Sequence, residues 1–300
     1  MAIHIRIPLQ ILFLIFVFCL SFDCQPNSFN NRGDYESKSY AETEILKCFL
    51  EERCGSKGSN STNDFQIPST LTTGLYAWYP LDGNINDLSG NHHHGYYPGG
   101  IWPVTAGPSY APSRSNLPNG AATFNGTNQL FASNFTPLCH EDFSIALWIY
   151  TSVVSNNRIM GYQSSPGANP GISLVLNASG NAEFSAYWVA YGYNGDGLSG
   201  AFSTVLSANV WTHITYVHNG ATRQGNIWIN GVNGGLTSNF GSFAGCTTGV
   251  SPNQWHSGTP LNIGYAYTGL FFTGQMDDIW FFQGRQLSAA DILTLMSLPF

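Results

Sequence analysis

From Leu75 onward, the sequence breaks into a dozen short stretches in which apolar and polar residues alternate, and Gly, Asn, Pro or Ser separates one stretch from the next. Alternation with a period of two is typical of strands, and no helical stretch lies between them. This pattern favours an all-β fold, a two-sheet antiparallel sandwich or jelly roll. We predict strands at residues 75–80, 120–125, 129–133, 142–151, 157–163, 171–176, 181–189, 201–206, 211–218, 225–230, 261–266 and 271–283.

The alternation also predicts which side chains lie between the sheets. Trp148 and Trp228 are expected on outer sheet faces, because their strand neighbours form the apolar set. The tail departs from the strand pattern: Ser288 is expected to cap a short helix over 289–296, with Asp291 in its first turn. The residues expected to point into the core from the two strands are Phe143, Ile145, Leu147, Ile149, Ile227 and Ile229.

Charged residues make up only 9% of the chain, against about 25% in ordinary soluble domains. After Gly74, four arginines face nine acidic residues, and the whole chain carries a net charge of −7. A nucleic-acid-binding protein needs clustered Lys and Arg to displace counterions, and no such cluster is present in the sequence. Nucleic acid is therefore excluded as a partner, whereas calcium or neutral sugars are compatible with this composition.

The first 73 residues differ from the rest. Residues 1–21 read as a signal peptide, since the apolar run at 11–22 is too short to span a bilayer. Residues 22–73 form an N-terminal segment, partly disordered or with a short helix, and include a Gly/Ser/Asn-rich linker at 55–63. The sandwich is expected over 74–300. These features predict a secreted, extracellular protein with no membrane span in the mature chain.

Export makes disulfides and glycans expected. Cys48 and Cys54 are close enough to staple a local turn, and Cys139 and Cys246 could join two strands or loops of the β region. The sequence does not fix these pairings, and Cys24 is left cleaved off, unpaired or intermolecular. Four Asn-x-Ser/Thr sequons are candidate glycosylation sites: Asn60, Asn125, Asn134 and Asn177.

Six segments, in order, resemble the laminin-G-like domains of the concanavalin A-like lectin/glucanase superfamily. "LYAWYPLDGNINDLSGNHHHG" (75–95) resembles the opening strand and loop, and "GAATFNGTNQLF" (120–131) the next hairpin. "DFSIALWIY" (142–150), "WTHITYVHNG" (211–220) and "GNIWINGV" (225–232) resemble central strands. "GQMDDIWFFQGRQLSAADILTLM" (274–296) resembles the closing strand and helix. The insert at 102–117 and the run of three histidines at 92–94 depart from the family pattern.

The resemblance implies a jelly roll, a frequent calcium ion, and carbohydrate or matrix glycoprotein ligands. Asp87 in the first loop and Asp277 at the last strand are implied to share one end of the sandwich. With the carbonyls of 88–93, and with Asn91 and Asp82 as secondary candidates, they would hold a structural calcium, which takes six to eight oxygen ligands. The alternative is that Asp87 only forms an Asx-turn.

An aromatic platform is the second candidate site, because sugar rings stack on Trp and Tyr. Trp188, Tyr191 and Tyr193 lie in the Gly- and Asn-rich stretch "YWVAYGYNGDG" (187–197), and Trp148 and Trp228 are further candidates. The alternative for each is ordinary packing. The histidine run is interpreted as a solvated loop, and His213 as structural.

Catalysis is not expected. Glycosidases of this fold need two carboxylates that flank the scissile bond, whereas Glu141 and Glu183 occur singly. Alternation is expected to send Asp277 and Asp278 to opposite faces. We therefore predict a secreted, non-catalytic module that binds carbohydrate. The alternatives are an extracellular adhesion or structural protein that binds a protein partner, and a glycosidase or polysaccharide lyase of the same fold.

Overall fold

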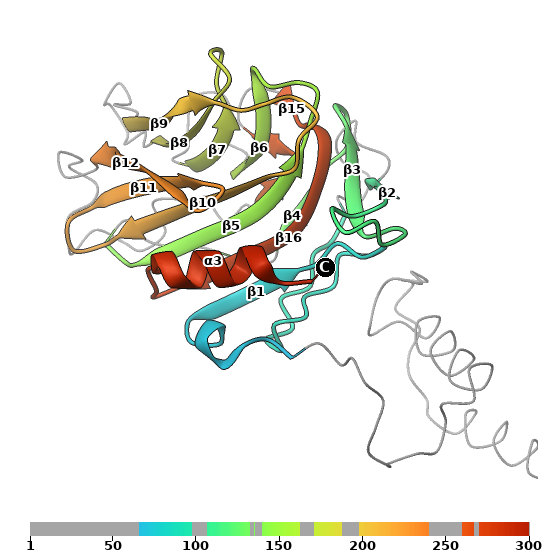
Figure 1. Ribbon diagram of the computed structural model, residues 1–300, viewed down its shortest axis with the longest axis horizontal. Helices are drawn as coiled ribbons and strands as arrows, with labels where there is room; N and C mark the ends of the chain where they lie inside the picture. The colour runs from blue at the N-terminus through green and yellow to red at the C-terminus, as the bar shows by residue number, and fades with distance from the viewer. Residues whose placement is uncertain are drawn as a thin grey trace, which may run out of the picture. The chain divides into compact units, whose positions relative to one another are not determined.

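A computed structural model describes residues 66–97, 107–132, 135, 140–162, 171–187, 198–239, 260–266 and 270–299. Within these residues the chain forms two stacked antiparallel sheets, with one helix lying across the outside of the larger sheet (Figure 1). Strands with alternating faces need such an arrangement, because each sheet must bury its apolar side against another layer.

The larger sheet has eight strands in the order β12-β11-β10-β5-β16-β3-β2, and β1 pairs with β16 beside β3. The strands of this sheet are β1 (Leu75–Tyr79), β2 (Ser109–Ala111), β3 (Ala121–Asn125), β5 (Phe143–Tyr150), β10 (Thr212–Asn219), β11 (Gln224–Ile229), β12 (Val232–Asn239) and β16 (Thr273–Gln283).

The smaller sheet has six strands in the order β4-β13-β6-β7-β8-β9. A separate two-stranded sheet pairs β14 (Tyr265–Ala266) with β15 (Leu270–Phe271). The strands of the six-stranded sheet are β4 (Leu130–Ala132), β6 (Asn157–Tyr162), β7 (Gly171–Leu176), β8 (Asn181–Tyr187), β9 (Leu198–Val205) and β13 (Leu261–Ile263).

The main core lies between the two sheets. All four apolar side chains predicted to point inward from β5 are buried there, and so are Ile227 and Ile229 from β11. The strand pattern is therefore confirmed at the level of single side chains. Two strands, β2 and β12, were not predicted, because neither stretch has a regular apolar alternation.

A second core covers the outer face of the eight-stranded sheet. Helix α3 (Ala289–Ser297) lies on this face and buries Ile292 and Leu295 against it. Trp78 and Trp280 stack there with ring centroids 4.5 Å apart, and the 3-10 helix η1 (Ser69–Leu71) adds Leu71. The larger sheet is therefore apolar on both faces along much of its width.

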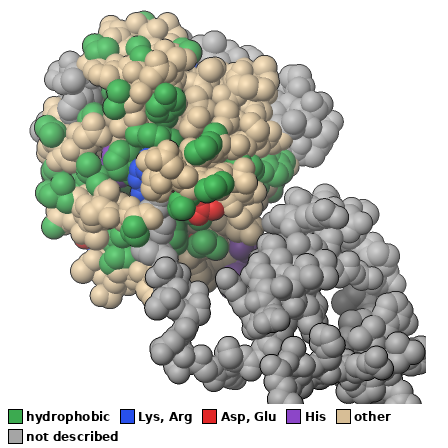
Figure 2. Space-filling model, turned by 45° about the vertical axis from the view of Figure 1, so that its right-hand side comes forward, with side chains coloured by type: hydrophobic (Ala, Val, Ile, Leu, Met, Phe, Trp, Pro, Cys, Tyr) green, Lys and Arg blue, Asp and Glu red, His purple; other side chains and the backbone are tan. Residues whose placement is uncertain are grey.

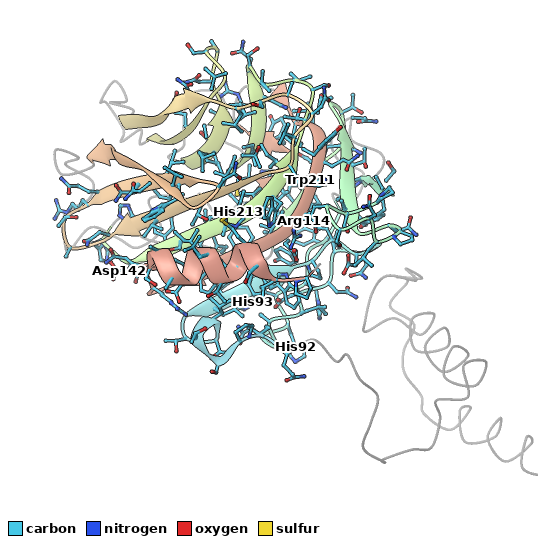
Figure 3. All side chains as sticks on the ribbon, in the orientation of Figure 1. His92, His93, Arg114, Asp142, Trp211 and His213 are labelled. Atoms are coloured by element: carbon cyan, nitrogen blue, oxygen red, sulfur yellow. The ribbon has the colours of Figure 1, made fainter. Side chains whose placement is uncertain are left out.

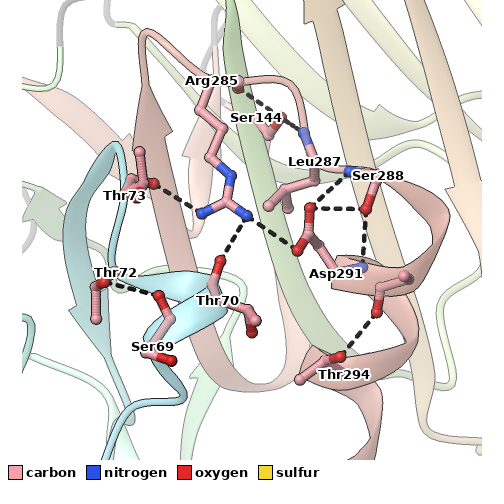
Figure 4. A network of polar contacts seen from close by, with 11 residues as sticks. Ser69, Thr70, Thr72, Thr73, Ser144, Arg285, Leu287, Ser288, Asp291 and Thr294 are labelled. Carbon is pink, nitrogen blue, oxygen red and sulfur yellow. Dashed lines mark hydrogen bonds and ion pairs between the residues drawn. The ribbon is translucent and has the colours of Figure 1, made fainter.

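Local hydrogen bonds hold α3 in place (Figure 4). Ser288 and Asp291 form the predicted capping box, since each side chain accepts from the other residue's backbone N–H. Arg285 contacts the Asp291 carboxylate at 2.9 Å and donates to the carbonyls of Thr70 and Thr73. The arginine thus ties the start of α3 to the segment that precedes β1.

These contacts change one predicted boundary. Residues 66–73 were assigned to the N-terminal segment, but η1 packs in the second core and Arg285 binds its carbonyls. These residues therefore belong with the sandwich, whose first residue precedes the predicted 74. The signal peptide at 1–21 and the predicted segment from 22 to 65 lie outside the described residues. Within the part that is described, no helix is long and apolar enough to cross a bilayer.

Candidate functional site

The site begins with an irregularity in β16. A β-bulge interrupts its pairing with β5 between Asp277 and Trp280, and Asp278 has a left-handed backbone with φ of 48°. A bulge adds one residue to a strand and so breaks the alternation of faces. Asp277 and Asp278 therefore lie on the same side, although alternation predicted opposite faces. That expectation was wrong because it assumed an unbroken strand.

Both carboxylates bind Arg114, which comes from the Pro- and Ser-rich insert. Its Nη1 lies 3.0 Å from Asp277 Oδ2 and 2.5 Å from Asp278 Oδ2, and Nη2 donates to the carbonyl of Leu298 at 3.0 Å. Trp78 Nε1 donates to Asp278 Oδ1 at 3.0 Å. We call these four side chains, Arg114, Asp277, Asp278 and Trp78, the Arg114 network. It joins the insert, β1, β16 and the end of α3.

Burial perturbs the charges of this network. Burial and, after it, the neighbouring Asp278 charge raise the pKa of Asp277 to about 8, against the opposing effect of Arg114. Burial also raises the pKa of Asp278 to about 6, against the effect of Arg114. On the same face, burial and then the Arg114 charge lower the pKa of His213 to about 3. A single guanidinium thus faces two carboxylates that both resist ionisation.

Asp87 was predicted to bind calcium with Asn91 and Asp277. Its Oδ1 accepts from the backbone N–H groups of Trp78 and Ser89, and its Oδ2 accepts from Ser89 Oγ and the His93 N–H. These four donors occupy the lone pairs of a carboxylate. Asp87 therefore forms the Asx-turn that was the alternative interpretation.

The other two predicted ligands are also engaged. Asn91 donates its amide to the carbonyls of Leu75 and Tyr76, and Asp277 pairs with Arg114. Among the described residues, no group of three or more His, Cys, Asp or Glu is placed to hold a metal ion. As arranged here, these residues do not fit the calcium site that the resemblance implies, and calcium stays a prediction.

Two of the three histidines are part of the first loop rather than solvated. His93 stacks on Tyr76 with ring centroids 3.9 Å apart, and its Nδ1 contacts the Tyr76 carbonyl at 2.8 Å. His94 Nδ1 accepts from the Asp87 N–H at 3.1 Å. His92 alone is exposed. The expectation of a solvated loop was therefore wrong for His93 and His94.

The aromatic residues that were predicted to form a sugar-binding platform do not come together among the described residues. Trp148 points to the outer face of the larger sheet as predicted, but Arg114 lies 5.0 Å above its ring and His213 contacts it at 5.1 Å. Trp228 packs against the second core. Trp148 and Trp228 thus follow the packing alternative. Trp188, Tyr191 and Tyr193 lie outside the described residues.

A pair that was not predicted lies next to Trp148, beyond the end of α3. Tyr150 and Trp211 contact each other with ring centroids 5.6 Å apart, and both are half-buried. Gln275 pairs across the sheet with Tyr150 and with Thr123, whose Oγ1 is buried without a hydrogen-bond partner. We call Tyr150, Trp211, Gln275 and Thr123 the outer strip.

Figure 3 shows Trp211, His213 and Arg114 gathered beside one end of α3. The surface in Figure 2 is dominated by uncharged polar and hydrophobic side chains, with few charged ones. The sequence carries only part of the signal for the outer strip: Trp211 precedes His213 by two residues, and Tyr150 follows Trp148 by two. Each therefore shares a sheet face with its neighbour.

Within the part of the chain that the structure describes, the other carboxylates do not form a pair that suits catalysis. Glu183 accepts from Asn177 Nδ2 at 3.0 Å, and Asp142 accepts from the Gly220 N–H. An open depression of about 470 Å³ is lined by His140, Glu141, Asp142, Ala221, Gln283 and Gly284. Asp277 and Asp278 do converge, but they are 0% and 2% exposed and are bound to Arg114, so a substrate does not reach them in this arrangement.

Two sequons can be placed. Asn125 is exposed, and its Oδ1 accepts from Thr127, while Asn177 is half-buried and holds Glu183. Asn60 and Asn134 lie outside the described residues, and so do the cysteines at 48, 54, 139 and 246. The disulfides and the glycans stay predictions.

Comparison with known proteins identifies the class. The family model of the concanavalin A-like lectin/glucanases superfamily matches residues 124–293, more than half of the chain. The chain belongs to this superfamily, which confirms the resemblance seen in the sequence. A search of curated proteins found no match.

Similar solved structures include sugar-binding domains of other proteins, one of which has a TM-score above 0.5. Domain 4 of AbnA, an extracellular arabinanase from Geobacillus stearothermophilus solved with arabinotriose, is 20% identical with a TM-score of 0.53, covering 74% of this chain and 97% of that one. A botulinum neurotoxin type C structure, described as dependent on two ganglioside molecules for cell entry, is 13% identical with a TM-score of 0.48. The match covers 77% of this chain and 53% of that structure, so this chain spans about half of its length.

A third match is the CBM40 of the Ruminococcus gnavus IT-sialidase, bound to α2,3-sialyllactose. It is 10% identical with a TM-score of 0.43, covering 58% of this chain and 95% of that one. Together with the family model, the similarity to the AbnA domain assigns the two-sheet architecture.

Proposed function

We propose that this protein is an exported, non-catalytic carbohydrate-binding module and that the outer strip contacts the sugar. The observation that carries the proposal is the Tyr150–Trp211 pair beside Gln275 and Thr123, on the part of the larger sheet that lies beyond α3. Aromatic faces pack on the apolar face of a sugar ring, while an amide and a hydroxyl meet its hydroxyl groups.

The electrostatics of the strip support a neutral ligand. Arg114, the nearest cation, is already engaged by two carboxylates and a carbonyl. It therefore has little capacity left to attract an anionic group. The arabinotriose seen with the AbnA domain is a neutral oligosaccharide and supports the same class of ligand. Among the described residues, the carboxylates near the strip are those of Asp277 and Asp278, which are buried and bound to Arg114, and this supports binding without catalysis.

The test uses the full chain, produced by secretion and applied to an array of arabino-, xylo-, gluco- and manno-oligosaccharides together with sialylated lactosides. We expect binding to a defined set of neutral glycans. Trp211→Ala should weaken it about tenfold or more, as for an aromatic anchor at an interface. Leu293→Ala, which truncates a side chain that is 56% exposed on α3, is the control and should leave binding unchanged. No binding by well-folded protein would contradict the proposal.

Export is part of the proposal, whereas calcium stays a prediction that the arrangement of Asp87, Asn91 and Asp277 does not favour, and the two are tested separately. Mass spectrometry of the secreted protein should find a start near residue 22 and a glycan on Asn125. A melting temperature that rises with calcium and falls with a chelator would support the ion. An unchanged melting temperature would leave Asp87 with its turn alone.

A further inference from the structure

We propose that an N-linked glycan on Asn125 lies along the outer strip and competes there with free carbohydrate. The inference rests on the proposed function, because it takes the strip as a sugar site, and it names one ligand of that site, the chain's own glycan. Asn125 is the first residue of the sequon Asn125-Gly126-Thr127, at the end of β3. Both Asn125 and Thr127 are exposed, so the sequon is accessible for modification.

Strand register places Asn125 next to the outer strip. Thr123, at one end of the strip, precedes Asn125 by two residues in β3, and Phe124 between them is in the main core. Alternation therefore puts Thr123 and Asn125 on the same outer face. On β16, which lies beside β3 (Figure 1), Thr273 pairs with Asn125 and Gln275 pairs with Thr123. Asn125 thus belongs to the row of the sheet that adjoins the strip.

The separation between Asn125 and the strip suits a glycan of a few sugars. Tyr150 pairs with Gln275 and is therefore two strands away from β3. Two residues along a strand span about 7 Å, and neighbouring strands are about 4.8 Å apart. These spacings put the backbone of Asn125 about 7 Å from that of Thr123 and about 12 Å from that of Tyr150. The first sugars of the glycan would contact Thr123 and Gln275, and later ones would contact the ring of Tyr150.

The local structure of the sequon suits attachment of a glycan. Asn125 Oδ1 accepts from the Thr127 backbone N–H at 3.0 Å and from Thr127 Oγ1 at 2.8 Å. These hydrogen bonds within the turn use the oxygen of the Asn125 amide and not its nitrogen. Nδ2, the atom that carries an N-linked glycan, lies on the other side of the amide group. The threonine of the sequon therefore holds the asparagine with its oxygen turned toward the loop.

The glycan and the outer strip match in chemistry. The core of an N-linked glycan is neutral and rich in hydroxyl groups, which is the class of ligand proposed for the strip. Tyr150 and Trp211 offer aromatic rings on which a sugar packs. Gln275 and Thr123 offer an amide and a hydroxyl on the side from which the glycan would approach. A glycan on Asn125 would therefore meet the polar end of the strip before the aromatic end.

Attachment gives this glycan an advantage over free sugar. A ligand on a short flexible tether has an effective concentration of about 1 mM. If the tethered glycan binds the strip with an intrinsic dissociation constant of about 0.1 mM, it weakens the apparent binding of a free glycan by about tenfold. A free ligand of high affinity still displaces it, whereas weakly bound sugars are excluded. The glycan thus sets a threshold of affinity for the strip.

The experiment compares forms of the full chain that are secreted from a eukaryotic host. Thr127→Ala removes the sequon, whereas the matched Thr127→Ser retains both the sequon and the hydroxyl. Ser179→Ala removes the sequon of Asn177, on the other sheet, and controls for the loss of a distant glycan. Intact mass should show one glycan fewer on Thr127→Ala than on Thr127→Ser. A wild-type chain with no glycan on Asn125 would overturn the inference.

Calorimetric titration with the free core pentasaccharide of N-linked glycans measures the competition. Thr127→Ala should bind the pentasaccharide about tenfold more tightly than the wild-type chain does. Thr127→Ser and Ser179→Ala should bind it as the wild-type chain does. Adding Trp211→Ala to Thr127→Ala should weaken binding by about tenfold or more, because it removes an aromatic anchor of the strip.

The outcomes distinguish this inference from the proposed function. Equal affinities of the wild-type and Thr127→Ala chains would overturn the inference and keep the strip as a sugar site. The same conclusion follows if Thr127→Ala binds neutral oligosaccharides of the array but not the pentasaccharide. A gain in affinity that is insensitive to Trp211→Ala would show that the glycan acts away from the strip and would overturn the inference. Failure of Thr127→Ala to bind any glycan would overturn the proposed function and the inference together.

Discussion

The two arginines on the outer faces of the two sheets have opposite environments. On the eight-stranded sheet, Arg114 contacts two carboxylates and the last carbonyl of the α3 region, and it covers the ring of Trp148. On the six-stranded sheet, Arg158 Nε and Asn262 Oδ1 are both buried without a hydrogen-bond partner. One face uses its buried polar groups to stabilise the fold, whereas the other buries polar atoms that form no such bond.

This difference concerns how polar groups on the two outer faces contribute to stability. The outer face of the larger sheet carries α3, η1 and the Arg114 network, and the outer strip lies on the same face. On the smaller sheet, Asn262 Oδ1 and Arg158 Nε make no hydrogen bond that a substitution would remove. Substitutions in the Arg114 network should therefore change stability more than matched substitutions on the smaller sheet.

The largest expected difference in the free energy of unfolding is between matched substitutions of the two arginines. Arg114→Met should lower the free energy of unfolding by about 3–5 kcal/mol, because it leaves buried carboxylates without their counter-charge. Arg158→Met, the matched change on the other face, should stay within about 1 kcal/mol, since it removes an unpaired donor. Urea unfolding at neutral pH measures both. Equal losses would show that the faces do not differ in this way.

Aromatic truncations test the same contrast. Trp228→Ala should lower the free energy of unfolding by about 2–3 kcal/mol, because the side chain packs in the second core. Tyr96→Ala should cost less than about 1 kcal/mol, because that ring, which contacts Phe131 of the smaller sheet, is close to half exposed. If Tyr96→Ala proves the more destabilising change in thermal unfolding, the aromatic pair at 96 and 131 has a packing role.

The pH dependence of stability reports the Arg114 network. The folded-state pKa values of Asp277 and Asp278, about 8 and about 6, lie above the ordinary 3.8. The folded protein therefore holds extra protons in this window, and stability falls as the pH rises from about 4 to about 8. His213 acts in the opposite sense: its pKa is lowered from 6.5 to about 3, so its contribution is lost as the pH falls through that range.

Asp277→Asn tests this assignment, because the amide keeps the shape but cannot ionise. Between pH 6 and 9, the melting temperature of the variant should decline less than that of the wild-type chain. Glu183→Gln removes one acidic charge from the other sheet and serves as the control. If the melting temperature of Asp277→Asn falls with pH as steeply as that of the wild-type chain, the titrating group is not Asp277.

The smallest expected change in the free energy of unfolding comes from the N-terminal cap of α3, the helix that covers the larger sheet. Ser288→Ala removes the capping box of α3 and should cost about 1 kcal/mol. Ser297→Ala, near the other end of the helix, loses only a hydrogen bond to the Thr294 carbonyl and should cost less. Denaturant titration compares the two. If Ser288→Ala leaves the free energy of unfolding unchanged, packing alone holds the helix in place.

Sequence pattern predicted the strands well because buried alternation is a strong physical constraint, and the capping box was evident from Ser288 and Asp291. The Arg114 network was not predictable in the same way. Its bulge requires Asp278 to adopt a left-handed backbone, which interrupts the alternation without any glycine to mark it. Arg114 itself lies in an insert with no periodicity, and only the folded chain shows that it lies against β16.

The outer strip illustrates the same limit. Spacing indicates that Tyr150 shares a face with Trp148 and that Trp211 shares one with His213, but not that β5 and β10 bring Tyr150 and Trp211 together. On the smaller sheet, Asn262 lies between Phe131 and Gly161, and this order depends on a crossover topology that local sequence does not encode. The chemistry of a single strand was readable, whereas the neighbours of that strand were not.

The pairing of β16 has a consequence for the order of events during folding. This strand lies between β5 on one side and β1 and β3 on the other, and Trp78 bonds to Asp278 across 200 residues. Contacts so distant in sequence are slow to form. During synthesis, β1, β3 and β5 emerge well before the strand that joins them, and their edges stay open until residues 273–283 follow. A nascent chain therefore depends on protection from aggregation until its last strand arrives.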